Sequence, residues 1–447
     1  SNSRTSLSNN DSGADNTVFG FLAGAALASG GDDNTVIGDY AGNALTTADG
    51  CVAIGSGAML VHTTGGQNIA IGAGAMDDTN VHANTLSSTY NVFIGSDSGG
   101  GTWTGSTASQ YNVAVGHLTM DAAMAGASNN AACGYASLSS LTTGNQNVGL
   151  GTAAGNAITT GDDNVCIGYR AGDAFDAENN NIFIGANAGG GGSLAVGSTI
   201  GIGSSALGAL TTGARNIAVG AYGLDALTVG DDNIALGFGA MGALSTVDGS
   251  DKNIAIGTYA MDDVGGLAAT QNIFIGYDSG GGSWTGTLSE KNVAIGNYTM
   301  DDVMNDADQN VAIGHNALSS LTTGSGSVCI GAYAGDAIVD VDSMVCIGQN
   351  AGTDIDHTDA VGTVCIGASA GENITSGIGN VAIGYQSLDA ASTSDYNTAV
   401  GHQALSAVTT GDGANVAVGY GAATAISTGV KNTAIGYNAL YRATTQS

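Results

Sequence analysis

Residues 310–324 read Asn-Val-Ala-Ile-Gly-His-Asn-Ala-Leu-Ser-Ser-Leu-Thr-Thr-Gly, and variants of this stretch recur along the chain. Its most regular part is the opening pentapeptide, usually Asn, a β-branched residue, a small residue, an aliphatic residue and Gly. The pentapeptide occurs in 24 copies between Asn16 and Gly436, at spacings of 17 to 23 residues. The fifth position is Gly in all 24 copies and the first is Asn in 19, so each copy opens one repeat.

A period of this length indicates a solenoid, because one repeat cannot bury its own apolar face and must stack on the next. Three β-prone residues before a Gly predict a short strand, and Gly and Asn suit corners where φ is positive. Stacking would bring equivalent Asn side chains within hydrogen-bonding distance. The sequence therefore predicts an all-β fold, an elongated parallel β-solenoid of about 24 coils. The Ala-Leu-x-x-Leu segment has helical spacing and leaves room for one short helical turn per coil.

The repeats extend over residues 16–447 without a linker, which predicts one repeat domain. Residues 1–15 are polar and are expected to form an N-terminal cap or a frayed segment. A second period lies above the first, because residues 68–144 return in closely similar form at residues 253–324. The offset is ten repeats, so a block of ten repeats is inferred to have been duplicated.

The third position of the pentapeptide is apolar although its two neighbours are apolar as well. If the large second and fourth residues form the solenoid core, the third must point the other way. A long exposed apolar stripe would then need a cover, and an interchain seam in a homo-oligomer supplies one. The alternative is that the third residue packs inside a flattened single-chain solenoid. The sequence analysis favours the seam, with these residues in it: Ala53, Ala70, Phe93, Ala114, Phe183, Ala255, Phe274 and Ala382.

The amino-acid composition excludes some classes of binding partner. The chain has 7 Lys and Arg against 38 Asp and Glu, a net charge of −31, which opposes binding to nucleic acid or to an anionic membrane surface. No apolar run is long enough for a membrane helix, so membrane insertion is not expected. Phosphate-loop, zinc and nucleophile motifs are missing from the sequence, so we do not expect an enzyme.

Two groups of residues are candidate binding sites. Trp103 and Trp284 lie in Gly-rich segments, where an exposed indole could stack on a sugar ring or pack against a neighbouring chain. Paired aspartates could bind Ca²⁺, which prefers carboxylate and carbonyl oxygens. Their distribution over non-adjacent repeats favours solvated corners over a shared metal site, and no other cofactor is expected. The aspartates considered as calcium ligands are Asp32, Asp33, Asp162, Asp163, Asp231 and Asp232.

Cysteine use is unlike that of a disulfide-stabilised protein. Cys329, Cys346 and Cys365 occupy the third position of successive repeats. Stacked parallel strands lie about 4.8 Å apart, a geometry in which cysteines pair poorly, and metal-binding spacing is absent. These residues are therefore expected to be buried free thiols.

The Asn-x-Ala-Ile-Gly unit resembles the head repeats of trimeric autotransporter adhesins of the YadA type. The longer forms at 310–324, 397–411 and 432–440 are similar to repeats of bacteriophage tail-fibre proteins. This resemblance extends over residues 16–447 and implies an extracellular homotrimeric fibre, on a virion or a cell surface, that attaches to a host glycan or protein receptor. The alternatives are a subunit of a polymerising extracellular filament and the head of a cell-anchored trimeric adhesin.

Overall fold

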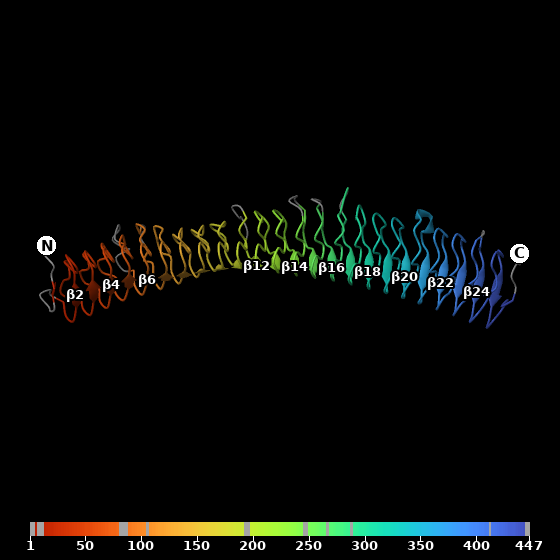
Figure 1. Ribbon diagram of the computed structural model, residues 1–447, viewed down its shortest axis with the longest axis horizontal. Coiled ribbons are helices and arrows are strands. Elements are labelled where there is room, and N and C mark those ends of the chain that lie inside the picture. Colours follow the sequence, from red (N-terminus) through yellow and green to blue (C-terminus); the bar gives the residue numbers. More distant parts are fainter. Residues whose placement is uncertain are drawn as a thin grey trace. The chain divides into compact units, whose positions relative to one another are not determined.

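The computed structural model describes residues 5–6, 13–79, 88–103, 107–191, 197–244, 249–264, 268–286, 289–410 and 413–442. The chain divides into two units, residues 1–221 and 222–447. Each unit is a parallel β-solenoid with one three-residue strand per repeat, and Figure 1 shows successive strands side by side within each unit. The all-β solenoid predicted from the pentapeptide is thereby confirmed.

In the first unit, β1 pairs antiparallel with β2, and each later strand pairs in parallel with the next. Its strands are Thr5–Ser6 (β1), Thr17–Phe19 (β2), Thr35–Ile37 (β3), Val52–Ile54 (β4), Ile69–Ile71 (β5), Val92–Ile94 (β6), Val113–Val115 (β7), Ala131–Cys133 (β8), Val148–Leu150 (β9), Val165–Ile167 (β10), Ile182–Ile184 (β11), Ile200–Ile202 (β12) and Ile217–Val219 (β13).

The second unit continues the same plan, and all its strands pair in parallel. Its strands are Ile234–Leu236 (β14), Ile254–Ile256 (β15), Ile273–Ile275 (β16), Val293–Ile295 (β17), Val311–Ile313 (β18), Val328–Ile330 (β19), Val345–Ile347 (β20), Val364–Ile366 (β21), Val381–Ile383 (β22), Thr398–Val400 (β23), Val416–Val418 (β24) and Thr433–Ile435 (β25).

The asparagine that opens the pentapeptide forms a buried ladder along each unit. Asn292 Oδ1 accepts hydrogen bonds from the backbone N–H of Asn310 at 3.0 Å and from its side-chain amide at 3.2 Å. The Asn310 amide also donates to Gly324 O at 2.8 Å. Each Asn thus satisfies buried backbone groups in two repeats, which confirms the predicted stacking of Asn side chains.

The glycine that closes the pentapeptide is required by the close approach of successive backbones. Gly168 has φ +132°, and a Cβ on it would lie 2.6 Å from the carbonyl oxygen of Gly185 in the next repeat. A side chain larger than hydrogen is therefore excluded at Gly168, and all 24 closing glycines have a positive φ, from 122° at Gly436 to 147° at Gly276.

The predicted assignment of the two strand faces is wrong. The third position of the pentapeptide points into the solenoid's own core, and the second and fourth point outward. The residues assigned to an interchain seam are all fully buried within the single chain: Ala53, Ala70, Phe93, Ala114, Phe183, Ala255, Phe274 and Ala382.

The reason for this arrangement lies in the opposite wall of the core. Leu318 and Leu321, which follow the strand β18, are themselves fully buried in the interior. The space left for the strand is small: a Cβ on Gly149 would lie 2.8 Å from Leu138 Cγ. Ala, Gly or Cys therefore fills the third position in most repeats, although Val36 of β3 is also fully buried there.

Glycine accommodates the three phenylalanines of the inner row, the row formed by the third pentapeptide residues. A Cβ on Gly99 would lie 2.6 Å from the Phe93 ring, and one on Gly280 would lie 2.5 Å from the Phe274 ring. The Gly-rich segments therefore compensate for the volume of the aromatic rings.

The helical turn allowed for in each coil is not formed. After β18, Asn316 and Leu318 take left-handed conformations with φ of 55° and 50°, which interrupt a right-handed helix. Among the described residues, helical structure is limited to the 3-10 turn Thr358–Ala360.

Candidate functional site

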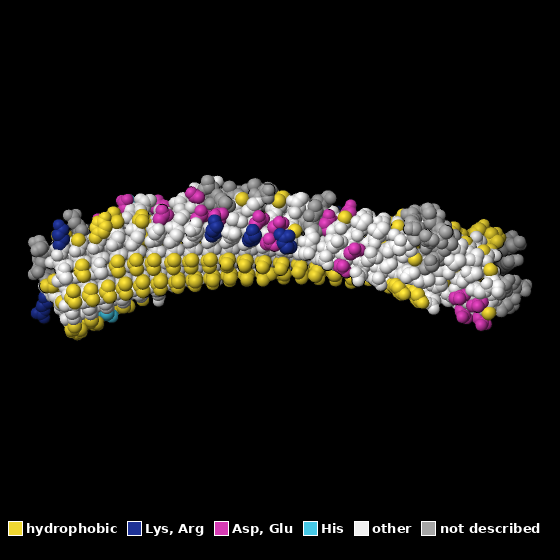
Figure 2. Space-filling view, turned by 180° about the vertical axis from the view of Figure 1, so that it is seen from behind, with side chains coloured by type: hydrophobic (Ala, Val, Ile, Leu, Met, Phe, Trp, Pro, Cys, Tyr) yellow, Lys and Arg dark blue, Asp and Glu magenta, His cyan; other side chains and the backbone are white. Residues whose placement is uncertain are grey.

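The outward face of each sheet carries two rows of aliphatic side chains, the second and fourth pentapeptide residues, called the outer rows here. Val113 and Val115 of β7 are 44% and 38% exposed. Leu150, Val219, Ile295 and Val418 belong to the same rows and are also exposed. Figure 2 shows such side chains as bands of hydrophobic atoms that pass from repeat to repeat. A contiguous apolar surface of this extent is typical of an interaction site.

Strand register makes the outer rows continuous within each unit. Val293 pairs with Val311 and Ile295 with Ile313, so each aliphatic side chain lies beside its equivalent in the next repeat. Polar side chains do not interrupt the rows at these strands. Sequence reasoning recognised that both faces of the strand are apolar but assigned the wrong face to the surface.

The tryptophans are core residues, and the prediction that they are exposed ligand-binding residues is wrong. Trp103 is fully buried and Trp284 is 1% exposed. Each indole packs edge-on against the phenylalanine of its own repeat, with centroid distances of 5.9 Å to Phe93 and 5.7 Å to Phe274. Each Nε1–H donates to a backbone carbonyl, so the polar atom is satisfied inside the core.

Paired aspartates at the corner before a strand form hydrogen bonds with backbone N–H groups. Asp32 Oδ1 accepts a hydrogen bond from the N–H of Ala14 at 2.6 Å, and Asp162 Oδ1 accepts one from the N–H of Asn145 at 2.7 Å. The second member of each pair, Asp33, Asp163 or Asp232, takes a left-handed φ between 58° and 62°. Asp231 donates its N–H to Asp251 Oδ1 at 2.8 Å.

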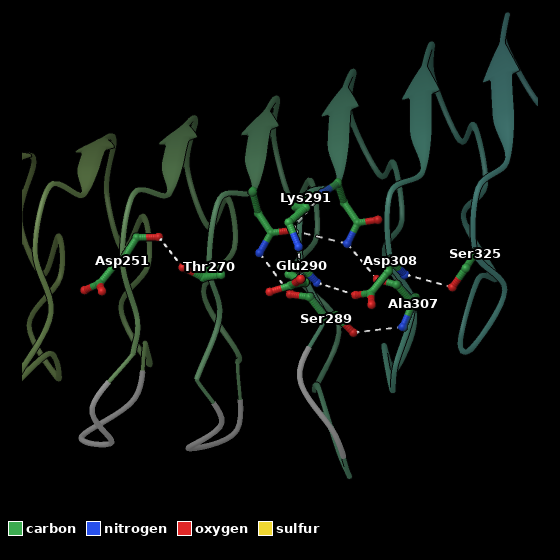
Figure 3. Close-up of polar contacts among 10 residues, drawn as sticks. Asp251, Thr270, Ser289, Glu290, Lys291, Ala307, Asp308 and Ser325 are labelled. Carbon is green, nitrogen blue, oxygen red and sulfur yellow. Dashed lines mark hydrogen bonds and ion pairs between the residues drawn. The ribbon is translucent and has the colours of Figure 1, made fainter.

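Figure 3 shows the same corner in the second unit. Asp308 Oδ1 accepts from the N–H of Glu290 at 2.7 Å, and the N–H of Asp308 donates to Ser325 Oγ at 3.1 Å. Lys291 forms an ion pair with the neighbouring Glu290. In the part of the chain that the structure describes, no three His, Cys, Asp or Glu side chains are grouped to hold a metal ion. Calcium binding stays a prediction, and the observed geometry gives Asp32 and Asp162 a role in backbone hydrogen bonding.

A second kind of aspartate follows the strand and is half-buried. Burial, together with neighbouring carboxylates, raises the pKa of Asp77 and of Asp262 to about 6 each. The same causes raise the pKa of Asp301 to about 7, with Asp278 as the strongest carboxylate contributor. These carboxyl groups form rows along the repeats. In the sequence they occur as Asp pairs, as the corner aspartates do, so the two kinds could not be told apart there.

An exposed row of aromatic rings in the second unit was missed by the sequence analysis. Phe238, Tyr259, Tyr277, Tyr298, His315 and Tyr333 follow one another on successive repeats. Neighbouring ring centroids lie 5.4 to 6.4 Å apart. Each residue stands one or two positions after the pentapeptide Gly, and this spacing is the signal that could have revealed the row.

The cysteine column is buried, and its thiols are free, as predicted. Strand register places each of these thiols beside the next: Cys329 lies opposite Cys346, and Cys346 lies opposite Cys365. Burial raises the pKa of the Cys329 thiol well above its ordinary value, which keeps this group protonated and unreactive.

No known family model matches the sequence, and no curated protein matches it. Among the described residues, none belongs to a helix with the length and apolar composition needed to cross a bilayer.

Proposed function

We propose that this chain is the structural and adhesive repeat region of an extracellular fibre, in which copies associate through the outer rows as a homotrimer. The observation that carries the proposal is the pair of outer rows, which are mostly aliphatic and partly or fully exposed. A β-solenoid is compatible with such a role, because stacked strands and the buried Asn ladder give a regular scaffold. No catalytic step is part of the proposal.

A second copy of the same chain is the occupant that suits the outer rows best. Within each unit the rows continue from strand to strand in register, so a symmetric arrangement of copies can match each row with its equivalent. The net charge of −31 opposes an anionic lipid surface or a nucleic acid as the cover. Three copies around one axis would close the assembly and shield the apolar rows of each.

The resemblance of the repeats is the basis for assigning the chain to a tail fibre or an adhesin. The same resemblance is the basis for proposing a location on a virion or cell surface and attachment to a host receptor. A filament built by end-to-end stacking is the alternative. The antiparallel pairing of β1 with β2 argues against it, because β1 occupies the strand edge on which another parallel repeat would add.

Sedimentation of the recombinant chain tests the proposal. We expect a discrete trimer mass that stays constant on dilution, whereas a filament gives a broad, concentration-dependent distribution. A variant with V113K, V115K, L150K and V219K places charges on the outer rows and is expected to sediment as a folded smaller species. T152K, at an exposed position off the strands, is the control and is expected to remain trimeric. A stable wild-type monomer at micromolar concentration would contradict the proposal.

Electron microscopy of intact particles with an antibody against the chain tests the location. Label on tail fibres supports the virion assignment. Label on a cell surface supports the adhesin instead, and label along extended polymers supports the filament.

A further inference from the structure

The aromatic row of the second unit lies next to a row of carboxylates. Tyr298 and Asp301 stand in the same repeat, three residues apart, and Asp302 follows directly. Gly281 in the preceding repeat keeps this region open: a Cβ there would clash with Asp278 and would lie 3.4 Å from Asp301 Oδ1. Exposed ring surface and carboxylate oxygens are therefore presented together.

A surface pocket of about 450 Å³ is formed where these two rows meet. It is lined by Tyr298, Asp301, Asp302, His315, Asn316 and Ser319, which come from two successive repeats. The pocket thus combines the rings of Tyr298 and His315 with the carboxylates of Asp301 and Asp302.

The electrostatics of the pocket favour a cation. The pKa of Asp301 is raised to about 7 by burial and by the charges of Asp278, Asp302 and Asp262. An arriving positive charge would offset this repulsion and favour the ionised carboxylate. The Tyr298 ring can add a cation–π contact.

We propose that this pocket binds organic ammonium ligands, carried either by an amino-sugar oligomer or by an alkyl polyamine. The carboxylates of Asp301 and Asp302 pair with the ammonium group, and the ring of Tyr298 packs against the apolar part of the ligand. Because carboxylates and rings recur on neighbouring repeats, the surface suits an extended ligand with several amines. The inference goes beyond the proposed structural role and does not depend on it.

Isothermal titration calorimetry of the full chain tests the site with three probes: a glucosamine tetramer, an N-acetylglucosamine tetramer and spermine. We expect the two amine probes to bind and the acetylated tetramer, which lacks the charge, to bind at least about tenfold more weakly. Tighter binding of the glucosamine tetramer identifies an amino sugar as the source of the ammonium group, and tighter binding of spermine identifies a polyamine.

Matched variants use the first copy of the duplicated block as the control. Y298L installs the leucine that stands at the equivalent position 118, and D301N/D302N removes the carboxylates without changing their size. Each is expected to weaken spermine binding by about tenfold, whereas D121N in the first copy leaves it unchanged. Spermine binding is expected to strengthen from about pH 5 to about pH 8. The Asp301 carboxyl, which faces Asp278, Asp302 and Asp262 and shares the pocket with His315, ionises in this range while alkyl amines stay protonated.

Three results would overturn the proposal. The first is absence of binding by both amine probes. The second is equal binding of the acetylated tetramer, which would remove the requirement for charge. The third is an effect of D121N as large as that of D301N/D302N, which would indicate diffuse attraction to an acidic surface. Thermal unfolding of each variant verifies that the fold is retained.

Discussion

The two copies of the duplicated block, residues 68–144 and 253–324, share their core and differ on the surface. Trp103 on Phe93 has the same buried edge-on contact as Trp284 on Phe274. The half-buried aspartates are shared as well, since Asp121 stands where Asp301 does. The positions just after the pentapeptide Gly differ. They are Gly74, Ser96, Leu118 and Tyr135 in the first copy, and Tyr259, Tyr277, Tyr298 and His315 in the second.

This difference separates positions that specify the repeat from positions that a surface can use. The Asn ladder, the inner row and the closing Gly are fixed by contacts between adjacent repeats. Side chains after the Gly point away from those contacts, so aromatic residues can replace small ones there without a change in register. The duplicated block therefore provides an internal control for each of the following predictions.

The largest expected effect is the removal of either tryptophan. Trp103→Ala and Trp284→Ala should each lower the free energy of unfolding by about 3–5 kcal/mol, since each leaves a cavity beside a buried phenylalanine. Urea unfolding measures the loss. Tyr259→Ala, on the exposed row, is the control and should cost far less. A loss below about 1 kcal/mol for one Trp alone would show that the two copies do not share a core.

Breaking the Asn ladder should have the next largest effect. Asn112→Ala and Asn292→Ala each remove an acceptor for two buried donors and are expected to cost about 2–4 kcal/mol in unfolding free energy. Asn→Ser at the same sites should cost less than half as much, because Ser327 already fills this position and accepts from the N–H of Met344. Equal losses for Ser and Ala would argue that the ladder bonds contribute little.

A smaller loss is expected at the glycines beneath the phenylalanines. Gly99→Ala and Gly280→Ala combine a left-handed φ with a clash against the ring and should cost about 2–3 kcal/mol. Gly57 has a similar φ of 68° but open space around it, so Gly57→Ala isolates the backbone part at about 1 kcal/mol. Thermal unfolding compares the three variants, and equal shifts would exclude ring contact as the cause.

The smallest effect concerns pH. The folded-state pKa of Asp301 is about 7, above the ordinary value of 3.8, so the folded chain holds a proton that the unfolded chain releases. Its stabilising contribution is complete below about pH 4 and is lost as the pH rises through about 7. Asp301→Asn should flatten this part of the stability–pH curve by less than about 1 kcal/mol, because the group is half-exposed.

Asp121→Asn should flatten the curve less, since the raised pKa of Asp121 has fewer carboxylate contributors. Chemical unfolding at several pH values measures both slopes. If the wild-type chain were more stable above pH 7 than near pH 4, the pH dependence would have the opposite sign. That result would contradict a raised pKa for Asp301.

Repetition made the fold readable from the sequence, but it could not identify the inward face. The spacing of Asn and Gly predicted the strands, their register and the Asn ladder, because those depend on residues that recur in every repeat. The inward face depends on what fills the opposite wall, where Leu318 and Leu321 are fully buried and limit the space beside the strand. An Ala between two large aliphatic residues suits either orientation by hydrophobicity alone. The burial of Trp103 depends in the same way on contacts that spacing does not reveal.

The register of the strands is kept when extra residues occur between one pentapeptide and the next. β5 and β6 pair residue for residue, Ile69 with Val92, although 23 residues separate their opening asparagines, whereas most repeats have 17. Extra length is therefore absorbed between the closing Gly of one pentapeptide and the Asn of the next. Peptides grafted into that segment would be displayed at regular intervals along the scaffold while the outer rows keep their geometry.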